Sequence, residues 1–267
     1  MAVTKLNARD EARRAGRDVE PANRADYSEA LERGLLVLRA FERGEERLTQ
    51  SQLARKLDLP RATVRRALLT LTHLGYVVAE DRTYRLAPEV LTLAAAYLTT
   101  NPVSRVLQPV CDALAEDFQA SCTTAVLHGP SAVMVARALP SQPLLIGQGI
   151  GFQVPAARSA LGRVLISGLD DEPRRAYLLG NVTRDEESLR RMEDVLARVR
   201  AQGHAYVADE VETGFHSIAV PLRRWDGVPI AALNVGANIE RLSEQHMLQR
   251  VRPVLQATAE RLRPRLV

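Results

Sequence analysis

Cysteine is scarce in this chain of 267 residues, in which only Cys111 and Cys122 occur. Two cysteines are too few for a disulfide framework or for a zinc site built from cysteine ligands, so both are expected to fill core positions. Long apolar runs are also absent, because stretches such as 91–98 end well before the roughly 18 to 20 residues that a membrane helix needs. Charged residues begin at Lys5, where a signal peptide requires an apolar core. We therefore expect a cytoplasmic protein without a membrane partner.

The sequence signatures of common enzymes are missing as well. There is neither a Gly-x-Ser-x-Gly nucleophile elbow nor a Walker-type phosphate loop, and the glycines of 147–151 lack the strand and the acid of a dinucleotide-binding site. The five histidines are scattered without metal-ligand spacing. The acidic stretch 209–212 is expected to form a loop beside a pocket rather than a cation site. We therefore assign no catalytic residue, metal ligand or cofactor.

Positive charge is concentrated at one end of the chain. The 46% share of hydrophobic residues and the length favour two folded domains. The formal net charge of +4 lies entirely in the first third, and within 49–79 five basic residues accompany a single acid, Asp58. Such an excess favours a polyanion as partner, although a solvated helix face gives the same pattern.

The first third is predicted to fold as three helices followed by a β-hairpin. Residues 1–26 show no sustained apolar periodicity and are expected to form a mobile tail. Ser28 and Thr49 are expected to cap the first two helices. The helices and strands are predicted over 28–42, 49–57, 61–74, 76–78 and 84–86. This order predicts a winged helix-turn-helix domain in 27–87.

The third of these helices has two distinct faces. Its packed face is predicted to hold Val64, Ala67, Leu68, Leu71 and Leu74. The opposite face carries arginine, threonine and histidine, and such a helix fits the major groove of DNA, where arginine binds guanine and threonine contacts a phosphate or a thymine methyl. The preceding helix begins with residues placed for phosphates, and the wing offers a further arginine. The candidate DNA-binding residues are Gln50, Ser51, Arg61, Thr63, Arg65, Arg66 and Arg82.

A helix predicted over 89–99 is apolar almost all round. A surface helix of this kind needs a covering partner. We therefore expect 88–100 to form a linker helix that packs against its copy in a dimer. Asn101 and Pro102 then mark the domain boundary.

The remaining residues, 101–267, alternate helices and strands. Helices are predicted over 106–118, 159–167, 187–202 and 243–262. Strands are predicted over 122–127, 133–138, 144–146, 205–207, 217–223 and 229–235. Hairpins join the strands, for example through Trp225-Asp226-Gly227, rather than βαβ units. This order predicts an antiparallel sheet covered by helices and an α+β protein overall.

The start of the helix at Ser159 is a candidate anion site. Its backbone N–H groups and the helix dipole suit a small carboxylate, and the small side chain of Ala160 leaves room for one.

Three polar residues on the predicted strands are further candidates. Arg137 is expected to share a strand face with Val133 and Val135, and to hold either a carboxylate or a structural ion pair. Ser217 and Asn234 interrupt apolar strands, which indicates inward-facing side chains that bind a ligand or satisfy backbone groups in the core.

Three stretches resemble the IclR family of bacterial transcription regulators. They are 59–68 with 74–77, 155–165, and 203–210 with 214–221. The resemblance runs from about Tyr27 to the C-terminus. It implies a winged-helix domain, a dimerising linker helix and a GAF-like effector-binding domain for a small metabolite, often a carboxylic acid. It also implies that the effector pocket has its floor and walls at Ala160, Leu161, Ser217, Asn234 and Gly236.

Within the family, 214–221 and 232–235 are most similar to regulators of protocatechuate and 4-hydroxybenzoate catabolism, although these usually have Leu-Arg in place of Phe215-His216. This implies an effector that is an aromatic hydroxy acid, with a short 2-oxo acid such as glyoxylate or pyruvate as the alternative. The expected partners are double-stranded operator DNA and further copies of the chain, in a dimer or tetramer. The second hypothesis is a ligand-sensing module that acts through a protein partner without DNA.

Overall fold

The chain divides into two compact units between Leu93 and Ala94. The computed structural model describes residues 27–42, 44–100, 102–140 and 149–266, with no side chains over 102–104. The predicted tail, 1–26, and the predicted strand 144–146 therefore lie outside the described residues. Each unit has its own hydrophobic core and is described by itself.

The described part of the first unit is a winged helix-turn-helix. Its elements are α2 (Glu29–Arg39), β1 (Leu48–Thr49), α3 (Gln50–Lys56), α4 (Arg61–His73), β2 (Val77–Glu80) and β3 (Thr83–Leu86). The strands form an antiparallel sheet in the order β1-β3-β2. The predicted caps are confirmed, because the side chain of Ser28 accepts a hydrogen bond from the N–H of Leu31 and Thr49 forms a reciprocal capping box with Gln52.

Helix α4 packs against α2 and α3 through one apolar face, as predicted. Val64 and Leu68 are fully buried and Leu71 is nearly so. Leu74 corrects the prediction, since it is 55% exposed instead of packed. The helix ends at His73, and Gly75 turns the chain away with a φ of +82°, so Leu74 lies beyond the packed face.

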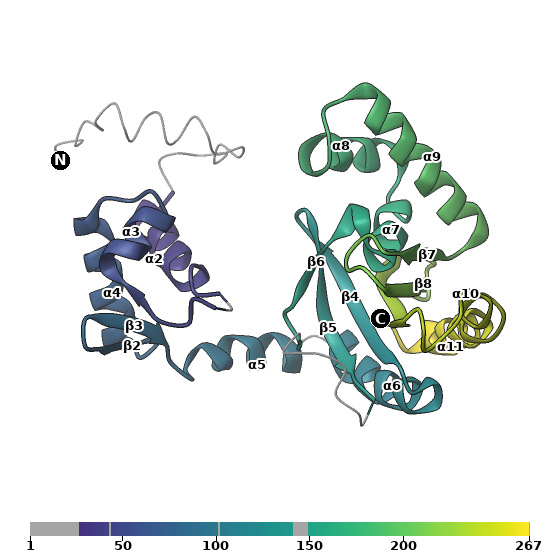
Figure 1. Cartoon of the computed structure of the whole chain (residues 1–267), viewed down its shortest axis with the longest axis horizontal. Coiled ribbons are helices and arrows are strands. Elements are labelled where there is room, and N and C mark those ends of the chain that lie inside the picture. Colours follow the sequence, from purple (N-terminus) through teal and green to yellow (C-terminus); the bar gives the residue numbers. More distant parts are fainter. Residues whose placement is uncertain (1–26, 43, 101, 141–148, 267) are drawn as a thin grey trace. The chain divides into compact units, whose positions relative to one another are not determined.

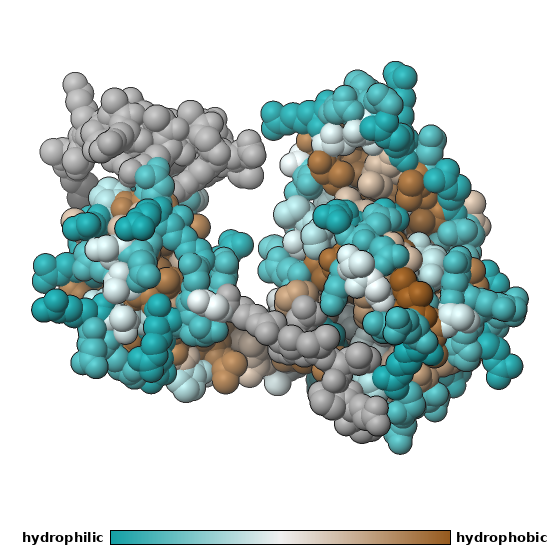
Figure 2. Space-filling model, in the orientation of Figure 1, coloured by the Kyte–Doolittle hydropathy of each residue, from teal (hydrophilic) through white to brown (hydrophobic). Residues whose placement is uncertain are grey.

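Helix α5 (Val90–Thr100) corresponds to the predicted linker and spans the division between the units. None of its residues is buried, and Leu91 and Leu93 are 68% and 53% exposed. Brown, apolar residues are visible in Figure 2 where the grey atoms leave this region uncovered. The described residues leave this apolar helix uncovered, which is consistent with the expected dimer contact.

The second unit is built on a six-stranded antiparallel sheet, and the predicted α+β class is confirmed (Figure 1). The sheet order is β6-β5-β4-β9-β8-β7. The strands are β4 (Ser121–His128), β5 (Ser131–Ala138), β6 (Gln153–Pro155), β7 (Ala205–Ala208), β8 (Phe215–Arg223) and β9 (Pro229–Asn238). The helices of at least eight residues are α6 (Pro102–Phe118), α7 (Ala160–Ser167), α8 (Asp171–Asn181), α9 (Glu186–Gln202) and α11 (Arg252–Leu262).

Helices cover both faces of this sheet. Helices α6 and α11 pack on one face, in a cluster that includes the fully buried Cys111 and Cys122, so both cysteines are core residues as expected. Helices α7 and α9 cover the other face, in a cluster that includes Ala160 and Leu161. The N-terminal helix of the unit, α6, therefore lies on the sheet face opposite α7.

Two predicted helices differ from the observed ones, and one helix is new. Helix α6 begins at Pro102 rather than at 106, and the predicted final helix over 243–262 contains a π-helical turn, Met247–Val251, between α10 (Glu244–His246) and α11. Helix α8 was not predicted. Leu178 is its one buried residue, so its sequence shows no repeating apolar stripe that would indicate a helix.

Candidate functional site

The exposed face of α4 carries arginines that no acid neutralises within the described residues. Arg61, Arg65 and Arg66 are exposed and form no ion pair there. Several other basic residues of the unit do have acidic partners: Lys56 pairs with Glu42 and Glu45, and Arg47 and Arg85 pair with Glu80. The arginines of α4 therefore give this helix face a positive potential, to which a polyanion would bind.

Thr63 corrects the prediction for this face, because only 9% of its surface is exposed. It starts the row Thr63, Ala67 and Leu71, which follows the four-residue spacing of the packed side of the helix. It is therefore not available to a phosphate or a base edge. Arg82 stands exposed in the β2–β3 turn, with a φ of +69°.

Gln50 and Ser51 begin α3 and are partly exposed. The side-chain amide of Gln50 donates to the carbonyl oxygen of Arg61 at 2.9 Å, so it ties the start of α3 to the start of α4. Gln50 thus has a structural contact in addition to any contact with DNA.

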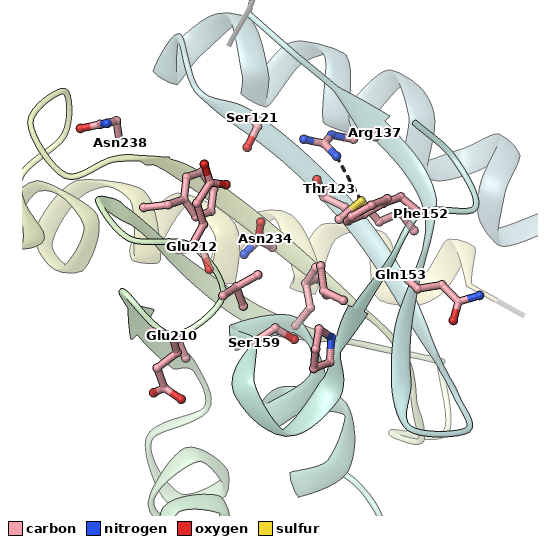
Figure 3. Close-up of a pocket in the computed structure, with 18 of the residues that line it drawn as sticks. Ser121, Thr123, Arg137, Phe152, Gln153, Ser159, Glu210, Glu212, Asn234 and Asn238 are labelled. Carbon is pink, nitrogen blue, oxygen red and sulfur yellow. Dashed lines mark hydrogen bonds between the residues drawn. The ribbon is translucent and has the colours of Figure 1, made fainter. Parts of the chain in front are cut away.

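The second unit contains a cavity of about 380 Å³ on the sheet face where α7 packs (Figure 3). Residues from all six strands of the sheet, the start of α7 and the loop 210–214 line it. Five of the seven predicted effector residues are among the lining residues: Arg137, Ser159, Leu161, Ser217 and Asn234. Ala160 and Gly236 are not.

Arg137 reaches the cavity because of a β-bulge. In the register between β4 and β5, Thr124 is paired with Ala136 and Ala125 is paired with Met134, so no residue of β4 is paired with Val135. The extra residue turns Arg137 onto the face of Met134, whose sulfur lies 3.4 Å from its Nη1. The expected sharing of a face with Val135 is therefore wrong. Burial lowers the pKa of Arg137, because desolvation disfavours the charged guanidinium.

The start of α7 contributes backbone rather than side-chain donors. The hydroxyl of Ser159 accepts a hydrogen bond from the N–H of Gly162 at 3.1 Å, so Ser159 caps the helix. Ala160 is fully buried in the core beneath the cavity, where its small side chain lets the helix approach the sheet. The first N–H groups of a helix have no intrahelical acceptor, so those of Ala160 and Leu161 are suited to an anion.

An acidic loop closes one side of the cavity, where one was expected. Glu210 and Glu212 line it, and Figure 3 shows both on the side opposite Arg137. The carboxylate of Glu210 pairs with Arg163 of α7 at 2.6 Å, and the Glu210 carbonyl accepts from Arg158. The loop is therefore held by Arg163 of α7 and by Arg158 in the 3-10 turn Ala156–Arg158 that precedes α7.

Gly236 shapes the cavity indirectly. A Cβ atom built on Gly236 would lie 2.5 Å from Cζ of Phe215 and 3.3 Å from Cβ of Ser217, both of which line the cavity. The glycine therefore creates the space that the Phe215 ring occupies. Ser121 donates to the carbonyl of Gly236 at 2.8 Å and fixes this part of β9.

Several lining residues were missed by the sequence analysis. Ser121 and Thr123 alternate with the buried Cys122 on β4, and this period of two could have assigned them to the cavity face. Phe152 and Asn238 also line the cavity, but they lie at or beyond strand ends, where no periodicity marks them.

His216 faces away from the cavity, as strand alternation requires. It is buried, and its Nδ1 lies 2.9 Å from the hydroxyl of Tyr206. Burial lowers the pKa of His216, although the negative charges of Glu244 and Asp209 act in the opposite direction.

Searches of the described residues found no group of acidic, histidine or cysteine side chains that could hold a metal ion. They also found no helix that is long and apolar enough to cross a membrane.

Comparison with known proteins identifies two family matches. Residues 30–81 match the IclR helix-turn-helix domain, and residues 95–263 match the bacterial transcriptional regulator IclR C-terminal family. The Pca regulon regulatory protein of Pseudomonas putida is 35% identical over 244 residues, which cover 89% of this chain and 84% of that protein.

Solved structures agree with these matches. An IclR family transcriptional regulator from Brucella abortus has a TM-score of 0.77 and 26% identity, and the match covers 91% of this chain and 94% of that one. A double mutant of the PobR transcription factor inducer binding domain from Acinetobacter, in complex with 3-hydroxybenzoic acid, has a TM-score of 0.55 and 30% identity. That match covers 61% of this chain and 98% of the other.

Proposed function

Because this chain belongs to the IclR family of bacterial transcriptional regulators, we propose that it binds operator DNA through α4 and that an aromatic hydroxy acid in the cavity controls this binding. The observation that carries the effector assignment is one cavity that combines Arg137, apolar walls and neutral polar side chains. The DNA assignment is carried by the arginines of α4.

In the DNA-binding step, the exposed face of α4 enters the major groove. Arg61, Arg65 and Arg66 supply donors for guanine edges or phosphates, and Arg82 at the wing reaches the backbone or the minor groove. Gln50 and Ser51 at the start of α3 contact phosphates.

Operator binding of Arg65→Ala and Arg66→Ala tests this interface. Each variant is expected to bind the DNA upstream of the protein's own gene about 5- to 100-fold more weakly, and loss of a phosphate contact lowers the salt slope by about one. Arg198→Ala removes an exposed arginine from α9 and serves as the matched control. Wild-type affinity in both α4 variants would refute the interface, and absence of any sequence-selective DNA binding in the wild type would favour action through a protein partner.

The cavity chemistry matches an aromatic ring that carries a carboxylate and a hydroxyl group. Met134, Phe152 and Phe215 provide apolar and aromatic surface for the ring. Arg137 offers a charge-assisted hydrogen bond to the carboxylate, while Asn234 can accept from and donate to a ring hydroxyl.

The size of the cavity favours this ligand over a short 2-oxo acid. A volume of about 380 Å³ lies within the range of roughly 300 to 1,000 Å³ typical of small-molecule sites, and glyoxylate or pyruvate would leave the apolar walls uncovered. The relatives support the same choice, since one is named for the Pca regulon and another holds 3-hydroxybenzoic acid.

Thermal unfolding with 4-hydroxybenzoate, protocatechuate, glyoxylate and pyruvate tests the effector class. A ligand at 100 times its Kd adds about 2.7 kcal/mol, which corresponds to roughly 5 to 10 °C for a unit of this size. We expect the aromatic acids to raise Tm and the 2-oxo acids to leave it unchanged. The reverse result would replace the proposed effector class.

The carboxylate has two candidate anchors, Arg137 and the start of α7. We assign it to Arg137, because its guanidinium lines the cavity and can form charge-assisted hydrogen bonds with a carboxylate. Arg137→Gln should then bind 4-hydroxybenzoate and its uncharged amide with similar affinity, whereas wild type prefers the acid. Arg198→Gln, which changes an exposed arginine of α9 outside the cavity, is the control. A persistent preference for the acid in Arg137→Gln would move the carboxylate to α7.

We further assign α5 to a contact between two copies of the chain. Its exposed leucines, Leu91 and Leu93, make a monomer unfavourable in water. Sedimentation of Leu93→Glu should show loss of the dimer that wild type forms. A wild-type monomer, or an unchanged Leu93→Glu dimer, would refute this assignment.

A further inference from the structure

The side-chain amide of Gln108 on α6 grips the backbone of β5 at Arg137. Its Oε1 accepts the N–H of Arg137 at 3.1 Å, and its Nε2 donates to the carbonyl oxygen of Arg137 at 2.9 Å. Nε2 also donates to Oδ1 of Asp112 at 2.9 Å. Nε2 therefore has two oxygen acceptors, one on Arg137 and one on Asp112, and these fix the orientation of the amide. In a flipped amide, Oε1 would lie against both of these oxygens and could accept no hydrogen bond from them.

These hydrogen bonds are located at the edge of β5 where no strand of the described residues pairs with it. On one side β4 accompanies β5, with Thr123 opposite Arg137. On the other side β6 pairs only as far as Val133, and the hydrogen bonds with 151–152 end at Met134. Gln108 therefore supplies the donor and acceptor that a strand would provide beyond the bulge at Val135.

The residue that Gln108 holds is also the cation of the cavity. The guanidinium of Arg137 lines the cavity, while both polar groups of its backbone are bonded to α6. In the chain, α6 starts at Pro102 and α5 ends at Thr100, so a single residue separates α6 from the helix that leads to the DNA-binding unit.

We propose that Gln108 is the positioning residue that couples occupancy of the cavity to the linker helix, and this proposal rests on the proposed function. A ligand that draws Arg137 toward the cavity shifts the end of β5. With Gln108 in place, α6 follows that shift and passes it to α5. Without the amide, α6 loses both hydrogen bonds to the backbone of Arg137, so less of the shift reaches α6.

The test is the coupling factor, which is the ratio of operator Kd with and without saturating ligand. Gln108→Ala removes the grip and keeps good helix propensity, and Gln108→Glu keeps the acceptor but loses the donor. Both variants are expected to bind ligand and free operator within about threefold of wild type, while the coupling factor falls toward one. Gln245→Ala, which removes an amide from an exposed helix position, should keep the wild-type factor.

The outcomes separate this proposal from the proposed function. A wild-type coupling factor in both Gln108 variants overturns the positioning role and leaves the proposed function intact. If the Gln108 variants lose ligand affinity to the same extent as they lose coupling, the positioning role is also overturned, because Gln108 then serves only to shape the cavity. If operator binding by the wild type responds to none of the four acids, the proposed function fails and the coupling role falls with it.

Discussion

Gly236→Ala should narrow the ligand cavity by moving one aromatic ring. The alanine Cβ would lie 2.5 Å from Cζ and 3.0 Å from Cε1 of Phe215. The ring must therefore retreat by about 0.9 Å to restore an ordinary contact of 3.4 Å. Gly236 is outside the cavity lining and Phe215 is part of it, so the retreat carries the ring into the cavity.

The expected loss of stability depends on which atoms must move to make room for the Cβ. Overpacking a protein interior costs about 1 to 3 kcal/mol, and we expect the lower end because a side chain beside a cavity can give way. Ligand affinity should suffer more than stability. Loss of snug contact on one side of an aromatic ligand is expected to weaken binding about tenfold, or about 1.4 kcal/mol.

Calorimetric titration with the effector and thermal unfolding of the free protein measure the two effects. Gly180→Ala is the matched control, since a Cβ at that helical position meets no atom within 4 Å. It should bind ligand normally and unfold at or slightly above the wild-type temperature. Wild-type ligand affinity in Gly236→Ala would refute the role assigned to the Phe215 ring, as would a loss of stability of several kcal/mol with the cavity unchanged.

Three further predictions concern the same unit. Gly162→Ala should lower the free energy of unfolding by at least about 3 kcal/mol in a denaturant titration. The added Cβ would lie 2.2 Å from the backbone of Ala156, which cannot move aside as a side chain can. A loss of less than about 1 kcal/mol would contradict this reasoning. Burial holds the pKa of His216 below its unfolded value of about 6.5, so the unfolded state binds more protons and stability should fall as the pH drops from 7 to 5.5. His216→Gln should weaken that dependence, and an identical pH profile would rule out the histidine as its source. Arg163→Met removes the ion pair with Glu210, which holds the acidic loop beside the cavity. The ligand should then dissociate several-fold faster in stopped-flow measurements, while the free energy of unfolding falls by about 1 kcal/mol or less. An unchanged off-rate would show that this loop does not retain the ligand.

Local chemistry explains which elements were predictable. The caps at Ser28 and Thr49 depend on a single side chain and the first turn of its helix, so the sequence suffices. The apolar stripe of α4 and the hairpin of β8 and β9 repeat over several residues, which makes their periods readable. Strands β1 and β6 are only two and three residues long, and they form only because each pairs with a neighbouring strand.

The cavity was only partly predictable. Residues such as Ser217 and Asn234 stood out as polar positions on apolar strands, and they do line it. Thr63 was misplaced because a position at the margin of a helix face is buried or exposed according to the neighbouring helices. Resemblance to a family named Leu161, which periodicity alone does not identify, but it also named Ala160 and Gly236, which do not line the cavity.

The sequence by itself determined the winged helix-turn-helix, the antiparallel α+β unit and the basic character of α4, because these depend on residue types and periods along one segment. Only the tertiary structure decided that Arg137 faces the cavity, since the bulge at Val135 arises from the pairing of β4 with β5. The space for Phe215 at Gly236 and the grip of Gln108 on β5 likewise join residues distant in sequence. Such contacts are set by how strands and helices pack, and no local pattern encodes them.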